Sequence, residues 1–215
     1  MDLSRLATVE APTACAAVCV DPAGRNQIAV GSGANLLARA AQVEDAALAP
    51  ATTLLLQMEV APAENAALIH RARARGARVV LNLAPAAMLP VEALRALDLL
   101  VANEHEATWL AAQLGCEAGA AALRRALGID VAVTLGEAGA ILATATGLRH
   151  TPAFPVQAVD TTGAGDAWCG VLVAALDRGL PLDAALRRAA AAAALACTRP
   201  GAAMPAAAET AALLA

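Results

Sequence analysis

Residues 53–83 read TLLLQMEVAPAENAALIHRARARGARVVLNL, two short apolar runs with a helical segment between them. The apolar runs are residues 54–58 and 79–83. Between them we expect a helix from Pro62 to Arg75 that ends at Gly76. Apolar runs that alternate with helices are typical of a parallel sheet whose strands are buried on both faces. This stretch therefore predicts an α/β fold.

The same alternation continues to the end of the chain. We expect strands at residues 99–102, 131–135 and 140–145, and helices at residues 91–97, 104–114, 118–127, 165–178 and 183–197. Only residues 136–139 separate the last two strands, which is too short for a crossover, so these two strands should be antiparallel. The sheet is thus predicted to be mostly parallel.

The first 50 residues follow a different pattern. Residues 15–30 alternate weakly around a turn at residues 21–24, which predicts a β-hairpin. A helix is expected at residues 36–47, and the arginines at positions 71, 73, 75 and 78 are expected at a solvated helix end. We treat residues 1–215 as one domain, with the hairpin at about 12–32 and the αβα core at 50–215.

Composition excludes several classes of protein. The net charge is −4 and the chain has one Phe, two Trp and no Tyr, so it has neither the basic stripe nor the aromatic platform of a nucleic-acid binder. No apolar stretch approaches the 18 or so residues that span a bilayer. All 15 cationic residues are Arg, which removes any mechanism that needs a lysine.

The five cysteines and the N-terminus predict a cytoplasmic protein. The cysteines lack CxxC spacing, so we expect reduced thiols rather than disulfides or a zinc site. The first residues carry an acid, Asp2, where a secretory signal needs cations. The three histidines, His70, His105 and His150, are expected to be solvated or packed, with His150 in a loop.

Residues 159–168, VDTTGAGDAW, contain the strongest candidates for catalytic residues. Gly163 and Gly165 stand where a helix begins, so backbone N–H groups can converge on an anion outside the helix N-terminus. A carboxylate beside such a site, here Asp166, suits a base that acts on a hydroxyl during phosphoryl transfer. The alternative is that Asp166 only complements the helix dipole and the glycines only make the turn.

Residues 160–166, DTTGAGD, closely resemble the signature of the ribokinase family of sugar kinases, also called the PfkB family. Further resemblances follow in the family's order: LLQME at residues 55–59, NEHE at 103–106 and TLGEAG at 134–139. Weaker ones are APT at 11–13, GAN at 33–35 and NLAPA at 82–86. The resemblance implies a three-layer αβα fold, mostly parallel, with the hairpin as the remnant of a β lid.

The resemblance also implies roles for individual residues. Asp166 would be the catalytic base and a sugar contact, and the N–H groups of Gly163, Ala164 and Gly165 would form the anion hole. Asn103 and Glu106 would organise phosphate and Mg²⁺, although the same pair also has the spacing of a helix capping box.

Further implied roles concern the nucleotide, the sugar and a monovalent cation. The nucleotide would lie against Thr134, Leu135, Gly136, Glu137, Ala138 and Gly139, otherwise an ordinary glycine turn, and against Gly165, Asp166 and Ala190. Glu59 would bind the sugar, with even weight given to a solvated side chain. A K⁺ site is implied at Asp160, Thr162, Ala196, Arg199 and Gly201.

The resemblance implies an ATP-dependent kinase that phosphorylates a sugar hydroxymethyl, with ribose as the first candidate and a homodimer as one assembly. The chain departs from the family because an opening strand and a Gly-Gly-rich segment do not precede Asp2. Ala190 also stands where the family offers Asn or His, and residues 202–205 replace a polar cation-site residue. We therefore expect this chain alone to show unpaired strand edges, little sugar kinase activity and weak Mg-ATP binding.

Two other functions were weighed. A non-catalytic nucleotide-binding remnant of the same family is the main alternative. A dinucleotide-binding oxidoreductase is disfavoured, because Gly163 and Gly165 lie late in the chain, without an early strand-turn-helix fingerprint and its acidic ribose contact.

Overall fold

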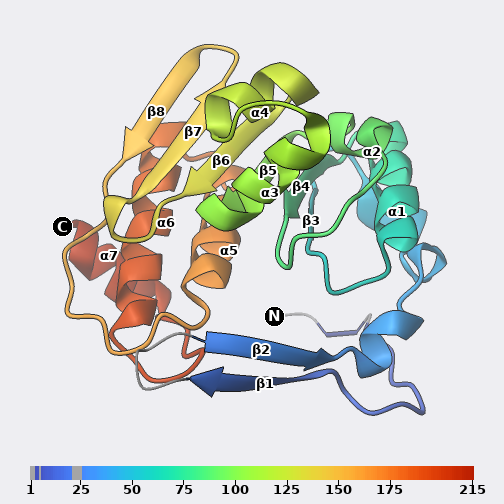
Figure 1. Ribbon diagram of the computed structural model, residues 1–215, viewed down its shortest axis with the longest axis horizontal. Helices are drawn as coiled ribbons and strands as arrows, with labels where there is room; N and C mark the ends of the chain where they lie inside the picture. The colour runs from blue at the N-terminus through green and yellow to red at the C-terminus, as the bar shows by residue number, and fades with distance from the viewer. Residues whose placement is uncertain (1–2, 5, 21–25) are drawn as a thin grey trace.

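The computed structural model describes residues 3–4, 6–20 and 26–215, and it contains two sheets (Figure 1). The main sheet has six strands in the order β3-β4-β5-β6-β7-β8. A separate antiparallel pair, β1 (Cys15–Val20) and β2 (Asn26–Gly31), lies below the main sheet in this view. The predicted hairpin strands are thus confirmed, whereas the turn expected at residues 21–24 lies outside the described residues.

In the main sheet the three strand pairs from β3 to β6 are parallel, and the two pairs from β6 to β8 are antiparallel. Its strands are β3 (Thr53–Leu56), β4 (Arg78–Asn82), β5 (Leu99–Asn103), β6 (Asp130–Thr134), β7 (Ala140–Thr144) and β8 (Gly147–Thr151). The pairing of β6 with β7 is antiparallel, as the short connection predicted. The edge strand β8 was not predicted, and His150 lies in this strand rather than in a loop.

Helices cover both faces of the main sheet (Figure 1). One face packs against α1 (Pro62–Arg75), α2 (Val91–Arg95), α3 (Glu104–Leu114) and α4 (Ala120–Leu127); the other packs against α5 (Ala164–Asp177) and α6 (Leu182–Cys197). Successive strand residues alternate between the two cores: Val79 and Leu81 join the first, and Val80 joins the second. The three-layer αβα fold is therefore confirmed.

Local sequence explains the helix limits in α1. Proline at the first helical position has no N–H to leave unpaired, so Pro62 begins the helix. Gly76 adopts φ +81° and its N–H bonds back to Ala72 and Arg73, which ends it. The final helix, α7 (Ala207–Leu214), was not predicted; it packs on α6 and buries Thr210.

The prediction of a helix at residues 36–47 is wrong. The segment forms three short 3₁₀ turns, η1 (Gly33–Leu37), η2 (Ala40–Gln42) and η3 (Asp45–Leu48). The reason is tertiary: Arg71 donates to the backbone carbonyls of Ala40 and Val43, and Glu64 accepts from the Ala40 N–H at 2.8 Å. Side chains of α1 therefore satisfy backbone groups that a helix would have paired internally. Arg71 is accordingly not at a purely solvated helix end.

Among the described residues, no helix has both the length and the apolar character required to cross a bilayer.

Replacing Leu100 by alanine tests which strands form the core. Leu100 is fully buried in the central strand β5, so Leu100→Ala should lower the free energy of unfolding by about 2–5 kcal/mol. Leu148→Ala is the matched control, because Leu148 lies on the edge strand β8 with 63% of its surface exposed. Urea unfolding followed by circular dichroism measures both. Equal losses in the two variants would contradict the assigned layers.

Candidate functional site

The carboxyl ends of the parallel strands bring distant segments of sequence to one edge of the sheet. Asn103, which ends β5, is the register partner of Thr134, which ends β6. The NEHE and TLGEAG segments begin at these two residues, so they lie side by side. Ligands of open α/β sheets bind outside this edge. The pairing therefore places the expected phosphate-side and nucleotide-side segments together.

The amino end of α5 is open to solvent. Gly163 adopts φ +75° at the N-cap, and a Cβ on it would lie 2.8 Å from Met204 Cε. A Cβ at Gly165 would meet nothing within 4 Å, so its backbone borders free space. Asp166 is exposed in the first turn. Of the three amides expected at the anion hole, that of Ala164 already donates to Thr161 O at 3.2 Å.

The buried thiol of Cys169 lies near two of the acidic residues expected in the site, Asp166 and Glu106. Burial is the main cause that raises the pKa of its thiol to about 12, and the charges of Asp166 and Glu106 raise it further. Asp166 belongs to α5 on one face of the sheet, whereas Glu106 belongs to α3 on the other. The two carboxylates therefore both lie near enough to the Cys169 thiol for their charges to act on it.

Asn103 and Glu106 form the capping box that their spacing allowed. The Glu106 N–H donates to Asn103 Oδ1 at 2.9 Å, and the Asn103 N–H donates to Glu106 Oε2 at 2.8 Å. Burial raises the pKa of Glu106, while the Asn103 bond and His105 oppose that rise. The helix start thus fixes the Glu106 carboxylate, while burial disfavours its charged form.

The TLGEAG segment makes a tight turn before β7. Leu135 N–H donates to Gly139 O at 2.8 Å, and residues 136–138 form η4 (Gly136–Ala138). A Cβ on Gly139, which has φ +94°, would lie 2.1 Å from Thr151 O, so only glycine fits there. Gly136, Glu137 and Ala138 are exposed. The turn therefore presents its backbone and the Glu137 side chain to its surroundings.

Two expected ligand contacts receive different support. Ala190 is buried on α6 and its methyl group can make only apolar contact. Glu59 is exposed, and its Oε2 accepts from Asn35 Nδ2 at 3.3 Å. Asn35 is joined to the hairpin's flank, because the neighbouring Ala34 N–H donates to Pro12 O at 2.8 Å. The segment expected to bind the sugar, residues 55–59, is therefore linked to residues 33–35 and through them to residues 11–13, the two weaker resemblances.

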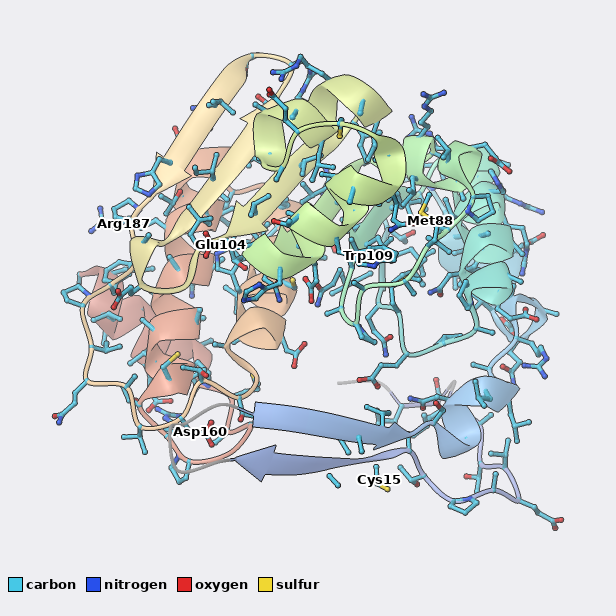
Figure 2. The ribbon with its side chains drawn as sticks, viewed as in Figure 1. Cys15, Met88, Glu104, Trp109, Asp160 and Arg187 are labelled. Atoms are coloured by element: carbon cyan, nitrogen blue, oxygen red, sulfur yellow. The ribbon has the colours of Figure 1, made fainter. Side chains whose placement is uncertain are left out.

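Asp160 ties the start of the DTTGAGD loop to the segment after α6 (Figure 2). Its carboxylate accepts from Thr162 N–H at 2.9 Å and from Gly201 N–H at 2.8 Å. The two bonds to Thr162, then that to Gly201, hold the pKa of Asp160 below its usual value. Asp160, Thr162 and Gly201 are thus brought together as expected for the cation site.

Ala196 and Arg199 contribute differently to that region. The Ala196 carbonyl accepts from Arg199 N–H at 3.2 Å, while the Arg199 guanidinium turns away to Met204 O and Glu209. Among the described residues, no cluster of three or more His, Cys, Asp or Glu could hold a metal. Sequence reasoning missed Met204 and Glu209. The only hint was the glycine at position 163, which leaves space for Met204.

Comparison with known proteins identifies the family. Residues 2–209 match the pfkB family of carbohydrate kinases. The chain belongs to this family. It is 36% identical to ribokinase of Haemophilus influenzae over 94% of this chain and 69% of that protein. It is also 36% identical to ribokinase of Staphylococcus aureus over 80% of this chain and 59% of that protein. The chain thus spans about 59–69% of these two relatives.

Solved structures agree with this assignment. A Thermotoga maritima ribokinase superposes with a TM-score of 0.85 at 33% identity, over 96% of this chain and 71% of that one. An Arabidopsis thaliana ribokinase, solved with ribose and ATP, gives a TM-score of 0.80 at 29% identity, over 95% of this chain and 70% of that one.

The lowered pKa of Asp160 predicts a loss of stability in acid. The folded protein binds this proton less tightly than the unfolded chain, so the stabilisation is present above pH 3.8 and is lost as the pH falls toward the lowered value. Asp160→Asn should therefore flatten the acid decline of the unfolding midpoint between about pH 6 and about pH 2.5. Thermal unfolding by circular dichroism measures it.

Asp130→Asn is the control with the opposite sign, because burial raises the pKa of Asp130. This variant should leave the acid decline at least as steep as in the wild type. An Asp160→Asn profile that parallels the wild type would show that the loop is not held by this carboxylate.

Proposed function

We propose that this chain carries the phosphoryl-transfer site of an ATP-dependent sugar kinase that resembles ribokinase. The reaction would transfer the ATP γ-phosphoryl group to a sugar hydroxymethyl, with ribose as the first candidate. The observation that carries this proposal is the convergence of Asp166 and Glu106 beside the open amino end of α5. Family membership and the Arabidopsis ribokinase solved with ribose and ATP support the same assignment.

In the proposed mechanism, each residue acts from the position its helix or loop gives it. The first-turn amides of α5 have no partner four residues earlier within the helix, so those of Gly165 and Asp166 can donate to phosphoryl oxygens. The Asp166 carboxylate would accept the proton of the sugar hydroxyl as that oxygen attacks phosphorus. Gly165 leaves room for the phosphoryl group because its Cα carries no side chain.

The turn and the capping box would position the nucleotide and its metal. Residues 134–139 would border the nucleotide with exposed backbone. Glu106, with Asp166, fits a single Mg²⁺, since that ion is usually held by one or two carboxylates together with substrate phosphates. When bound, ATP would supply the phosphoryl group and Mg²⁺ would neutralise its charge. Asp160, Thr162 and Gly201 lie close enough together to form part of a K⁺ site. Both Asp160 oxygens already accept backbone N–H groups.

Sugar binding would come from Glu59 and its neighbour Asn35. A carboxylate and an amide at hydrogen-bond distance offer the mixed acceptors and donors that sugar hydroxyls need.

We also propose a cytoplasmic location, supported by the free thiols of Cys15, Cys116, Cys169 and Cys197, and a homodimer as one assembly. Nucleotide binding without transfer is the second candidate; it is favoured by the exposure of Glu59, the residue proposed to bind the sugar.

Asp166→Asn tests the proposed base. The change keeps shape but removes the proton acceptor, so ribose-dependent release of ADP should fall by about 10²- to 10⁴-fold. The affinity for Mg-ADP, measured by calorimetry, should stay nearly constant. Asp177→Asn is the control, because it makes the same substitution at the opposite end of α5. It should not change turnover when the folded fraction is taken into account.

The wild-type assay decides between the two candidates. Mg-ADP binding with ribose-dependent turnover supports the kinase, whereas binding without turnover supports the nucleotide-binding alternative. Asp166→Asn with more than about a tenth of the wild-type kcat would remove Asp166 from the role of base.

Gly165→Val tests whether the free space at α5 is used by a ligand. The fold should tolerate the added side chain, because a Cβ at Gly165 meets nothing within 4 Å. It would crowd the space proposed for the phosphoryl group, so Mg-ADP affinity and turnover should fall together. Gly170→Val is the matched control on the same helix, since a Cβ there also meets nothing within 4 Å. Unchanged activity in Gly165→Val would mean that the turn is only structural.

A further inference from the structure

A cavity lies between the edge strand β8 and the first turns of α6, outside the residues assigned to phosphoryl transfer. Its volume is about 380 Å³. Residues 149–154 form one wall, and Asp183 and Arg187 form the other. The function proposed above makes no use of this cavity.

Arg149 lines the cavity with a guanidinium that is paired on one side only. Its Nη1 lies 3.1 Å and 3.4 Å from the two carboxylate oxygens of Asp183. Its Nε is buried and has no hydrogen-bond partner. A buried donor on a cation costs free energy when it has no acceptor, so the Asp183 carboxylate alone does not satisfy all the donors of Arg149.

Arg187 brings a second positive charge to the same cavity (Figure 2). Its guanidinium stacks 5.8 Å from the centre of the Phe154 ring. Within the described part of the chain, no carboxylate pairs with Arg187. The aromatic ring therefore holds the side chain in place while its N–H groups stay available.

We propose that this cavity binds a small phosphate monoester. Two guanidinium groups face one carboxylate, which leaves a net positive charge. A phosphate monoester is nearly a dianion at neutral pH, and its oxygens match the guanidinium fork. The ester is favoured over free phosphate because the cavity has room beyond one phosphate group and an apolar wall at Pro152, Ala153 and Phe154.

The cavity is connected to the turn at residues 134–139. His150 Nε2 lies 2.8 Å from Ala138 O, and Gly139 packs directly against Thr151 and Ala153. The wall formed by residues 149–154 therefore cannot move without affecting that turn. We expect an anion in the cavity to change the affinity for Mg-ADP, and Mg-ADP to change the affinity for the anion by the same factor.

Calorimetry with glycerol 3-phosphate tests the proposal, because this probe is neither the proposed substrate nor its product. The wild type should bind it, and bind free phosphate more weakly and glycerol not at all. Arg187→Ala should weaken binding by about 10- to 100-fold, since charge-assisted hydrogen bonds are lost. Arg188→Ala is the control, being the next residue on α6 and outside the cavity lining.

Two further measurements make the test decisive. Phe154→Leu should also weaken binding, because it removes the ring that orients Arg187 while keeping an apolar wall. Far-ultraviolet circular dichroism would show that each variant is folded. Equal affinity in the wild type and Arg187→Ala, or no binding by a folded wild type, would overturn the site. An unchanged Mg-ADP affinity in the presence of glycerol 3-phosphate would overturn the coupling, whatever the outcome for sugar phosphorylation.

Discussion

The parallel pairing of β5 with β6 determines where the segments that follow these two strands, residues 103–106 and 134–139, can lie. Because Asn103 and Thr134 are register partners, the helix that follows β5 and the turn that follows β6 start from adjacent points. A shift by one residue would exchange the buried faces of these strands, which bury Val101 on one side and Leu100 on the other. The hydrophobic cores thus fix the register, and the register fixes the geometry of the polar edge.

Close backbone approaches then complete the site. Gly139 allows the turn after β6 to lie against Thr151, and Gly163 allows the DTTGAGD loop to lie against Met204. Asp160 joins this loop to Gly201 through its two oxygens, and Glu209 of α7 holds Arg199 on the same segment. The loop before α5 is therefore supported by residues 199–209. Such a support orders N–H groups before any anion binds, which is what electrostatic stabilisation of a transferring group requires.

The elements that sequence predicted well are those whose limits depend on local chemistry. α1 and α3 run between the residues expected, because Pro62, Gly76 and the Asn103–Glu106 capping box are local signals. The helix expected at residues 36–47 failed because Arg71 and Glu64, distant in sequence, take over its backbone groups. β8 was missed because its polar residues, including Arg149 and His150, lie on an exposed edge and do not form an apolar run. The site followed the same rule: its motifs could be found by sequence, but the contacts of Met204 and Glu209 could not.

The proposed reaction depends on the charges around α5. A carboxylate in a first turn is stabilised by the helix dipole, so Asp166 alone would be unremarkable. Glu106 approaches from α3, across the sheet, and burial already disfavours its negative charge. Two acidic groups beside the same buried thiol gain nothing for stability from each other, since like charges repel. The helix dipole and the Asn103 N–H offset part of this cost, and a cation bound beside the two carboxylates, as proposed for Mg²⁺, would offset more of it.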